Sequence, residues 1–83
     1  MSPARGSRRT PTEQQLEQRA RFGRRLRQLR VARDLSQERL AELAGLDRQT
    51  IGYWERARTN PGLDEITAVA GALDVDLWQL FVG

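Results

Sequence analysis

The sequence predicts an all-α fold, a compact single domain of five short helices, and three observations support this prediction. Apolar residues recur at helical spacing along most of the chain, and no segment shows the period of two that is typical of a half-buried strand. Candidate helix caps such as Ser36 and Asp47 precede these segments. The 83 residues are also too few for more than one domain, because chains divide into domains only at much greater length.

The first helix is predicted to begin after Thr12 and to run to about Arg33. Thr12 and Gln15 have the spacing of a capping box, in which each residue binds the backbone of the other. The positions that follow at helical spacing are Leu16, Ala20, Phe22, Gly23, Leu26, Leu29 and Arg30. Arg24, Arg25 and Arg27 are expected on the solvent side. Residues 1–11, rich in Pro, Ser, Gly and Arg, are predicted to be a disordered basic arm that leaves residues 12–83 as the domain.

Residues 36–56 have the pattern of a helix-turn-helix. Ser36 is the N-cap of a helix of about eight residues, and Gly45 ends that helix where a left-handed conformation is needed. Asp47 caps the next helix, which begins at Arg48 and presents its amino-terminal residues outward. The apolar face of the first helix and the inward pair of the second are Leu40, Leu43 and Ala44, and Ile51 and Trp54.

Two further helices are predicted after the turn at Asn60-Pro61-Gly62. The fourth helix carries Leu63, Ile66, Val69, Ala70 and Leu73. Asp74-Val75-Asp76 separates it from a last short helix, whose inward face is expected to be Leu77, Leu80 and Phe81.

The charge of the chain is unevenly distributed. All fourteen basic residues are arginine, and the formal net charge is +3. Ten arginines against two glutamates give residues 1–33 a charge of +8, whereas four arginines against nine acidic residues give residues 34–83 a charge of −5. A basic segment joined to an acidic body suggests a polyanionic partner, nucleic acid before an anionic membrane surface. A solvated surface that is merely basic is an equally good interpretation of the charge alone.

The composition excludes several classes of chemistry. The chain has no cysteine and no histidine, so it lacks disulfides, thiolate nucleophiles, Cys/His zinc sites and the usual general base near neutral pH. No nucleophile–base pair or phosphate-binding glycine loop is visible, and no apolar run approaches the ~18 residues of a membrane span. We therefore expect a cytoplasmic protein that is not an enzyme and has no metal or other cofactor.

At the helix-turn-helix the chain resembles the DNA-binding domain of phage repressors and Cro, the XRE family. The resemblance covers about residues 20–82 and depends on Ser36-Gln37-Glu38, Leu40-Ala41, Ala44-Gly45-Leu46, Thr50-Ile51, Trp54-Glu55-Arg56 and Asn60-Pro61. It implies a lambda-repressor-like fold and a small, repressor-like transcriptional regulator. Such a protein binds double-stranded DNA in the bacterial or phage cytoplasm, with its recognition helix in the major groove.

The resemblance also implies roles for individual residues. The positions that reach base edges correspond to Arg48, Gln49 and Tyr53, and those near the DNA backbone to Gln37, Thr50, Arg56, Arg58, Thr59 and Asn60. Gln37 would also brace the recognition helix. The alternative is that the base-contact positions are ordinary exposed residues and that Gln37 is only a good first-turn residue.

Other positions are interpreted as structural. Arg30 and Glu55 correspond to a partly buried ion pair of the family, and Trp54 to its core. Ala57 replaces a common glycine, so the third helix is expected to end differently or to run longer.

The sequence leaves alternatives open for both the oligomeric state and the binding partners. Trp78 and Val82 are expected to face outward from the last helix and to form a two-fold dimer interface. The alternative is a monomer in which Trp78 folds back over the first helix. An antitoxin-type or partner-dependent interaction module is the second function class, and the arm either follows a DNA groove or only solubilises the chain. Since the sequence ends at Gly83, we expect regulation by concentration, a partner or competition rather than by an attached sensing domain.

Overall fold

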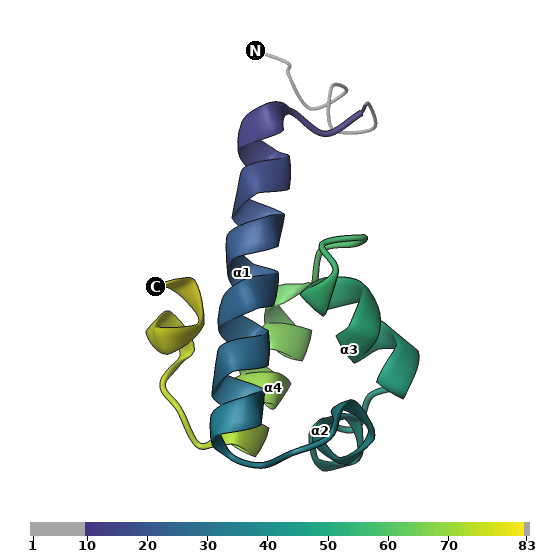
Figure 1. The fold of residues 1–83 in the computed structure, drawn as a ribbon, viewed down its shortest axis with the longest axis vertical. Helices are drawn as coiled ribbons and strands as arrows, with labels where there is room; N and C mark the ends of the chain where they lie inside the picture. Colours follow the sequence, from purple (N-terminus) through teal and green to yellow (C-terminus); the bar gives the residue numbers. More distant parts are fainter. Residues whose placement is uncertain (1–9, 83) are drawn as a thin grey trace.

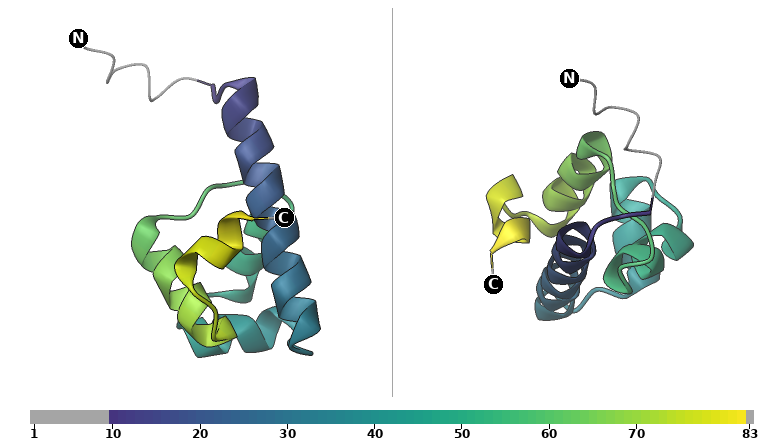
Figure 2. Two further views of the ribbon diagram at one scale, coloured as in Figure 1. Left: turned by 90° about the vertical axis from the view of Figure 1, so that its left-hand side faces the viewer. Right: turned by 90° about the horizontal axis from the view of Figure 1, so that it is seen from above.

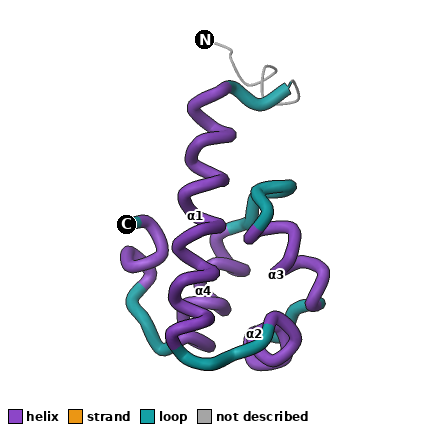
Figure 3. Tube along the Cα trace, in the orientation of Figure 1, coloured by secondary structure: helices purple, strands orange, loops and turns teal. Residues whose placement is uncertain are grey.

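The computed structural model describes residues 10–82, and this part of the chain contains helices and no strand. The elements in chain order are α1 (Glu13–Ala32), α2 (Gln37–Ala44), α3 (Arg48–Glu55), α4 (Leu63–Leu73) and the 3-10 helix η2 (Leu77–Phe81), joined by short loops (Figure 3). The all-α prediction agrees with these elements. The expected number of five helices is wrong, because four are α-helices and the last is a five-residue 3-10 helix. The predicted arm lies outside the described residues except for Thr10 and Pro11, as does Gly83.

Helix α1 begins at the predicted capping box and projects beyond the rest of the domain. The Thr12 hydroxyl oxygen accepts from the Gln15 N–H at 3.1 Å, and the Gln15 side-chain oxygen accepts from the Thr12 N–H at 3.0 Å. Only the carboxy-terminal part of the helix packs against other helices, while the amino-terminal part rises above them (Figure 1). Leu16 is therefore 44% exposed, although it continues the apolar spacing of the helix.

The two helices α2 and α3 form the predicted helix-turn-helix. The Ser36 hydroxyl accepts from the Arg39 N–H at 2.9 Å, and Gly45 has a left-handed φ of 73°. The turn is closed by the Leu46 N–H, which donates to the Ala41 carbonyl at 2.8 Å. Asp47 occupies the N-cap position of α3, but its side chain makes no capping hydrogen bond. The geometry of the turn is thus set mainly by backbone contacts around Gly45.

The core lies between the four α-helices and η2. Leu26, Leu40, Ile51, Leu73 and Leu80 are fully buried there. Gly23 allows the closest approach, because a Cβ at this position would overlap the Trp54 carbonyl oxygen and lie 3.0 Å from the Glu55 carbonyl oxygen. Backbone atoms cannot move aside as a flexible side chain can. The absence of a side chain at Gly23 is therefore what brings the end of α3 against α1.

The inward face expected for the last helix holds for Leu80 and only in part for Leu77 and Phe81. Leu80 is buried, but Leu77 is 37% exposed and Phe81 is 55% exposed. The last helix is a five-residue 3-10 helix, so the α-helical spacing used for the prediction does not apply to it. Trp78, at 61% exposed, faces outward, whereas the Phe81 ring lies 5.8 Å from the ring of the buried Phe22 of α1. The views agree that η2 lies on the opposite side of α1 from α3 (Figures 1 and 2).

Arg25 and Ala57 also differ from expectation. Arg25 is half-buried rather than on the solvent side, and its Nε donates to the Gln79 carbonyl of η2 at 2.8 Å. Helix α3 ends at Glu55 and does not run longer, because Ala57 adopts a left-handed φ of 60° in the loop that follows. The loop conformation usual for glycine is thus retained with an alanine, at the cost of local backbone strain.

Candidate nucleic-acid interface

Helix α3 has one buried face and one exposed face, as its eight residues predict. Ile51 and Trp54 are 0% and 2% exposed and fix the helix against α1 and the core. Arg48, Gln49 and Tyr53 are exposed, whereas Thr50 is half-buried. The outer surface of α3 therefore carries a guanidinium, an amide and a phenol on a helix whose other side is immobilised. These are groups that can bind base edges.

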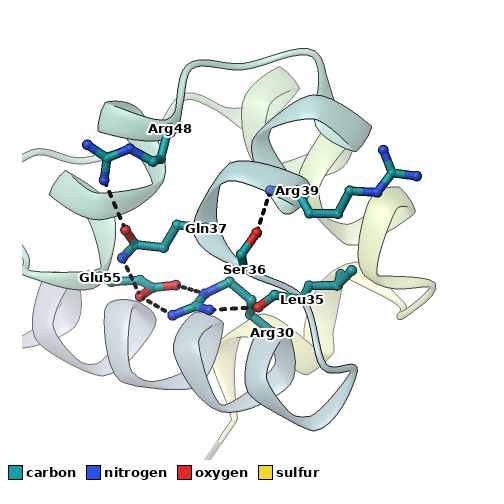
Figure 4. A network of polar contacts seen from close by, with 7 residues as sticks. All are labelled: Arg30, Leu35, Ser36, Gln37, Arg39, Arg48 and Glu55. Carbon is teal, nitrogen blue, oxygen red and sulfur yellow. Dashed lines mark hydrogen bonds and ion pairs between the residues drawn. The ribbon is translucent and has the colours of Figure 1, made fainter.

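The ion pair predicted between Arg30 and Glu55 is present and is mostly shielded from water. Arg30 Nε donates to Glu55 Oε2 at 2.7 Å and Arg30 Nη2 donates to Glu55 Oε1 at 3.0 Å, with side chains 11% and 4% exposed (Figure 4). Arg30 Nη1 also donates to the Leu35 carbonyl at 2.7 Å. The hydrogen bonds that Arg30 donates to Glu55 raise the pKa of the Arg30 guanidinium, and burial opposes this rise only in part. The pair joins α1, the α1–α2 loop and the end of α3.

Gln37, at the start of α2, lies between this ion pair and the recognition helix. Its Nε2 donates to Glu55 Oε1 at 3.1 Å, and its Oε1 accepts a longer hydrogen bond of 3.5 Å from Arg48 Nη1 (Figure 4). The bracing role expected for Gln37 thus has a geometric counterpart. The contact between Gln37 and Glu55 was not predicted, since no local pattern relates residues 18 positions apart.

The end of α3 and its following loop hold the remaining candidates. The Arg56 guanidinium carbon lies 5.6 Å from the centre of the Tyr53 ring, a cation–π contact that the sequence analysis missed although the residues are three positions apart on a helix. Arg58, Thr59 and Asn60 are exposed in the loop. Gly52 contributes space here, since an added Cβ would lie 3.2 Å from the Arg56 guanidinium.

Pairing changes the local charge of this surface. Glu55 is one of the nine acidic residues of the carboxy-terminal part, but its carboxylate is covered by Arg30 and does not face solvent. Arg48, Arg56 and Arg58 are exposed around α3, and Asp47 is the acidic residue next to them in the chain. The surface around α3 is therefore basic even though residues 34–83 are net acidic.

Within residues 10–82 no group of three acidic side chains is arranged to hold a metal ion. None of the described helices combines the length and the apolar run needed to cross a membrane.

The helix-turn-helix family HTH_3 matches residues 26–77. The immunity repressor protein of Bacillus phage phi105 is 44% identical over 55 residues, which are 66% of this chain and 38% of that protein. A hypothetical transcription factor of Neisseria meningitidis serogroup B is 42% identical over 72 residues, which are 87% of this chain and 66% of that protein. The chain thus spans less than two thirds of either curated relative.

Among solved structures, the restriction-modification controller protein C.AhdI from Aeromonas hydrophila is similar in both fold and sequence. The TM-score is 0.75 at 49% sequence identity, and the match covers 76% of this chain and 96% of that chain.

Proposed function

The chain belongs to the HTH_3 helix-turn-helix family, a family of DNA-binding transcription regulators, and from this premise we propose that it is a sequence-specific regulator that reads double-stranded DNA with α3. The observation that supports this proposal is the exposed face of α3, where Arg48, Gln49 and Tyr53 stand on a helix fixed by buried Ile51 and Trp54. A rigid helix with an exposed polar face fits the major groove. The proposal involves no catalytic step.

The side chains on α3 can distinguish base pairs. The Arg48 guanidinium can donate two hydrogen bonds to the O6 and N7 atoms of guanine, and the Gln49 amide can bind the N6 and N7 atoms of adenine. Tyr53 would contact a thymine methyl group or a phosphate. The residues proposed to bind the DNA backbone, and so to set the register without reading sequence, are Gln37, Thr50, Arg56, Arg58, Thr59 and Asn60.

We further propose that two copies bind together through the outer face of η2. Trp78 and Val82 are 61% and 41% exposed, and the nearby Phe81, whose ring packs against Phe22, is 55% exposed. A stable interface buries about 800 Å² on each partner, more than one tryptophan and one valine supply. An open groove of about 910 Å³, lined by Phe22, Ile66 and Phe81 among others, adjoins this face and would add the missing area. A dimer would bind two half-sites about 34 Å apart.

The dimer is tested by sedimentation equilibrium of Trp78→Ala. We expect at least tenfold weaker self-association, because the largest exposed apolar side chain of η2 is removed. Leu43→Ala is the control, since Leu43 is 47% exposed but lies on α2. Equal dimerisation by both variants and the parent would contradict the interface.

Sequence-specific binding is tested by selecting sites from random duplex DNA and then comparing two variants. Arg48→Ala should lose ~1–3 kcal/mol on the selected site and relax the preference at one base pair. Arg58→Ala should weaken the selected and the random duplex by similar factors and reduce the salt dependence, because it contacts only phosphate. If both variants weaken both duplexes equally, Arg48 is not a base reader. If no site is enriched, the proposed function itself fails.

A further inference from the structure

Gly52 is buried although it lies on the outward side of α3. Residues four apart share a face of an α-helix, so Gly52 lies between Arg48 and Arg56, and both of these arginines are exposed. The group that covers Gly52 is the Arg56 guanidinium, since a Cβ added to Gly52 would lie 3.2 Å from Arg56 Nη1 and 3.7 Å from Arg56 Nη2. The Arg56 side chain therefore folds back along α3, and its guanidinium rests on the backbone at Gly52 instead of extending past the end of the helix.

The ring of Tyr53 holds this guanidinium from a second side. The Arg56 guanidinium carbon lies 5.6 Å from the centre of the ring, within the ~6 Å over which a cation is attracted to an aromatic face. A cation–π contact uses the flat face of the guanidinium, whereas its N–H groups lie in the plane of the group and point away from the ring. The position of the Arg56 guanidinium is thus fixed without the use of its hydrogen-bond donors, and these donors remain available to an acceptor on DNA.

The location of the guanidinium indicates which acceptor it meets. The same Cβ added to Gly52 would lie 3.7 Å from Gln37 Oε1, so the Arg56 guanidinium lies on the side of α3 that faces the start of α2. In a helix-turn-helix the second helix enters the major groove while the first crosses the phosphate backbone, so the space between the two helices faces a phosphate at the edge of the groove. A guanidinium matches a phosphate well, because it can donate two parallel hydrogen bonds to it.

We propose that Tyr53 and Gly52 position Arg56 for its phosphate contact, so that the guanidinium is in place before DNA binds. Tyr53 acts through the face of its ring, a role separate from the base contact proposed for it, and Gly52 acts by leaving empty the space that the guanidinium occupies. An arginine that is held beforehand loses less rotamer freedom on binding, and a cation–π contact at an exposed site corresponds to about twofold to fivefold in affinity. The inference rests on the proposed function, in which Arg56 binds the DNA backbone.

The principal test compares Tyr53→Phe with Tyr53→Leu, since phenylalanine keeps the ring and leucine removes it. Dissociation constants are measured for a random duplex, to which the protein binds mainly through phosphate contacts. We expect Tyr53→Leu to bind about twofold to fivefold more weakly than Tyr53→Phe. On the Arg56→Ala background the two variants should bind equally, because the ring then has no guanidinium to hold. A difference of the same size on that background would show that the ring contacts DNA itself, and this result would overturn the proposal.

The acceptor is tested with Arg56→Ala alone. This variant should weaken the selected site and the random duplex by the same factor, and the slope of log affinity against log salt concentration should fall by about one. Weaker binding of the selected site only would make Arg56 a base reader, and it would overturn the assignment of the phosphate contact.

Gly52→Ala separates positioning from stability. The added Cβ meets a flexible guanidinium and no backbone atom of another element, so helix propensity should raise the melting temperature. The guanidinium is displaced at the same time, so the affinity for the random duplex should fall by about the same factor as in Tyr53→Leu, and on the Arg56→Ala background it should not fall. Gly71→Ala in α4 is the control, since nothing lies within 4 Å of its added Cβ, and it should bind DNA as the parent does. Equal affinity of Gly52→Ala and Gly71→Ala would overturn the role of Gly52.

The positioning is also measured without DNA. Nitrogen-15 relaxation of the Arg56 Nε–Hε group should show restricted motion in the parent and in Tyr53→Phe, and greater motion in Tyr53→Leu. Equal motion in all three proteins would overturn the proposal. The proposed function fails by a different result, which is that no site is enriched from random duplex DNA. If a site is enriched and the Tyr53 and Gly52 variants bind DNA as tightly as the parent, only the present inference fails.

Discussion

The amino-terminal part of α1, residues 13–20, and its carboxy-terminal part, residues 21–32, form one continuous helix in very different surroundings. The second part is covered by α3, α4 and η2, and it buries Phe22, Leu26 and Leu29. The first part projects past these elements, so Leu16 is 44% exposed (Figure 1). The same apolar spacing therefore has two outcomes, because spacing predicts which residues share a face but not where the neighbouring elements end.

The arginines of α1 differ in the same way. Arg30 is held in the buried ion pair, Arg25 binds a backbone carbonyl of η2, and Arg24 faces solvent. The basic first third of the chain is thus partly structural. The candidate base-reading residues Arg48, Gln49 and Tyr53 lie in the net-acidic part instead.

The largest expected effect is on the free energy of unfolding, when one leucine in each part of α1 is replaced by alanine. Leu26→Ala should lower the free energy of unfolding by ~3 kcal/mol, since Leu26 is fully buried and its truncation leaves a cavity. Leu16→Ala should change it by less than ~0.5 kcal/mol, because the side chain is already in contact with water. Urea denaturation of both variants measures the difference. Equal losses would mean that the projecting part is covered in solution, as a dimer contact would require.

A glycine substitution gives the next largest effect. Gly23→Ala should cost ~2 kcal/mol, because its Cβ meets the backbone carbonyls of Trp54 and Glu55 and forces α1 away from α3. Gly71→Ala in α4 is the matched control, since nothing lies within 4 Å of the added Cβ. That variant should gain up to ~1 kcal/mol from helix propensity alone. Thermal unfolding followed by circular dichroism distinguishes the two, and stabilisation by both would refute the close crossing at Gly23.

The smallest expected effect is on stability, when each of two neighbouring arginines of α1 is replaced by alanine. Arg25→Ala should lose ~1 kcal/mol, the usual contribution of one partly buried hydrogen bond, because η2 is released from α1. Arg24→Ala should stay within ~0.5 kcal/mol of the parent. Amide hydrogen exchange in η2 gives the more specific measurement, and we expect faster exchange only for Arg25→Ala. Unchanged exchange in both variants would contradict the contact with Gln79.

Much of the local structure could be predicted from the residues concerned. The capping box of Thr12, the cap of Ser36 and the left-handed Gly45 are present as expected. The pair of Arg30 and Glu55 was expected from the family resemblance and is also present. The contact roles of the α3 residues and the dimer remain predictions that the experiments above test.

The sequence by itself determined the four α-helical segments, the caps at Thr12, Ser36 and Gly45, and the side of α3 that faces the core, because each depends on residues within about one helical turn. Only the tertiary structure decided that Phe81 packs against Phe22 while Trp78 stays exposed, that Arg25 is partly buried, and that Gln37 meets Glu55. The partners in these last two contacts are 54 and 18 residues apart in the sequence, and no local sequence pattern specifies contacts over such separations. The outer face of η2 depends instead on whether the last turn is α or 3-10, which packing against α1 and α4 decides.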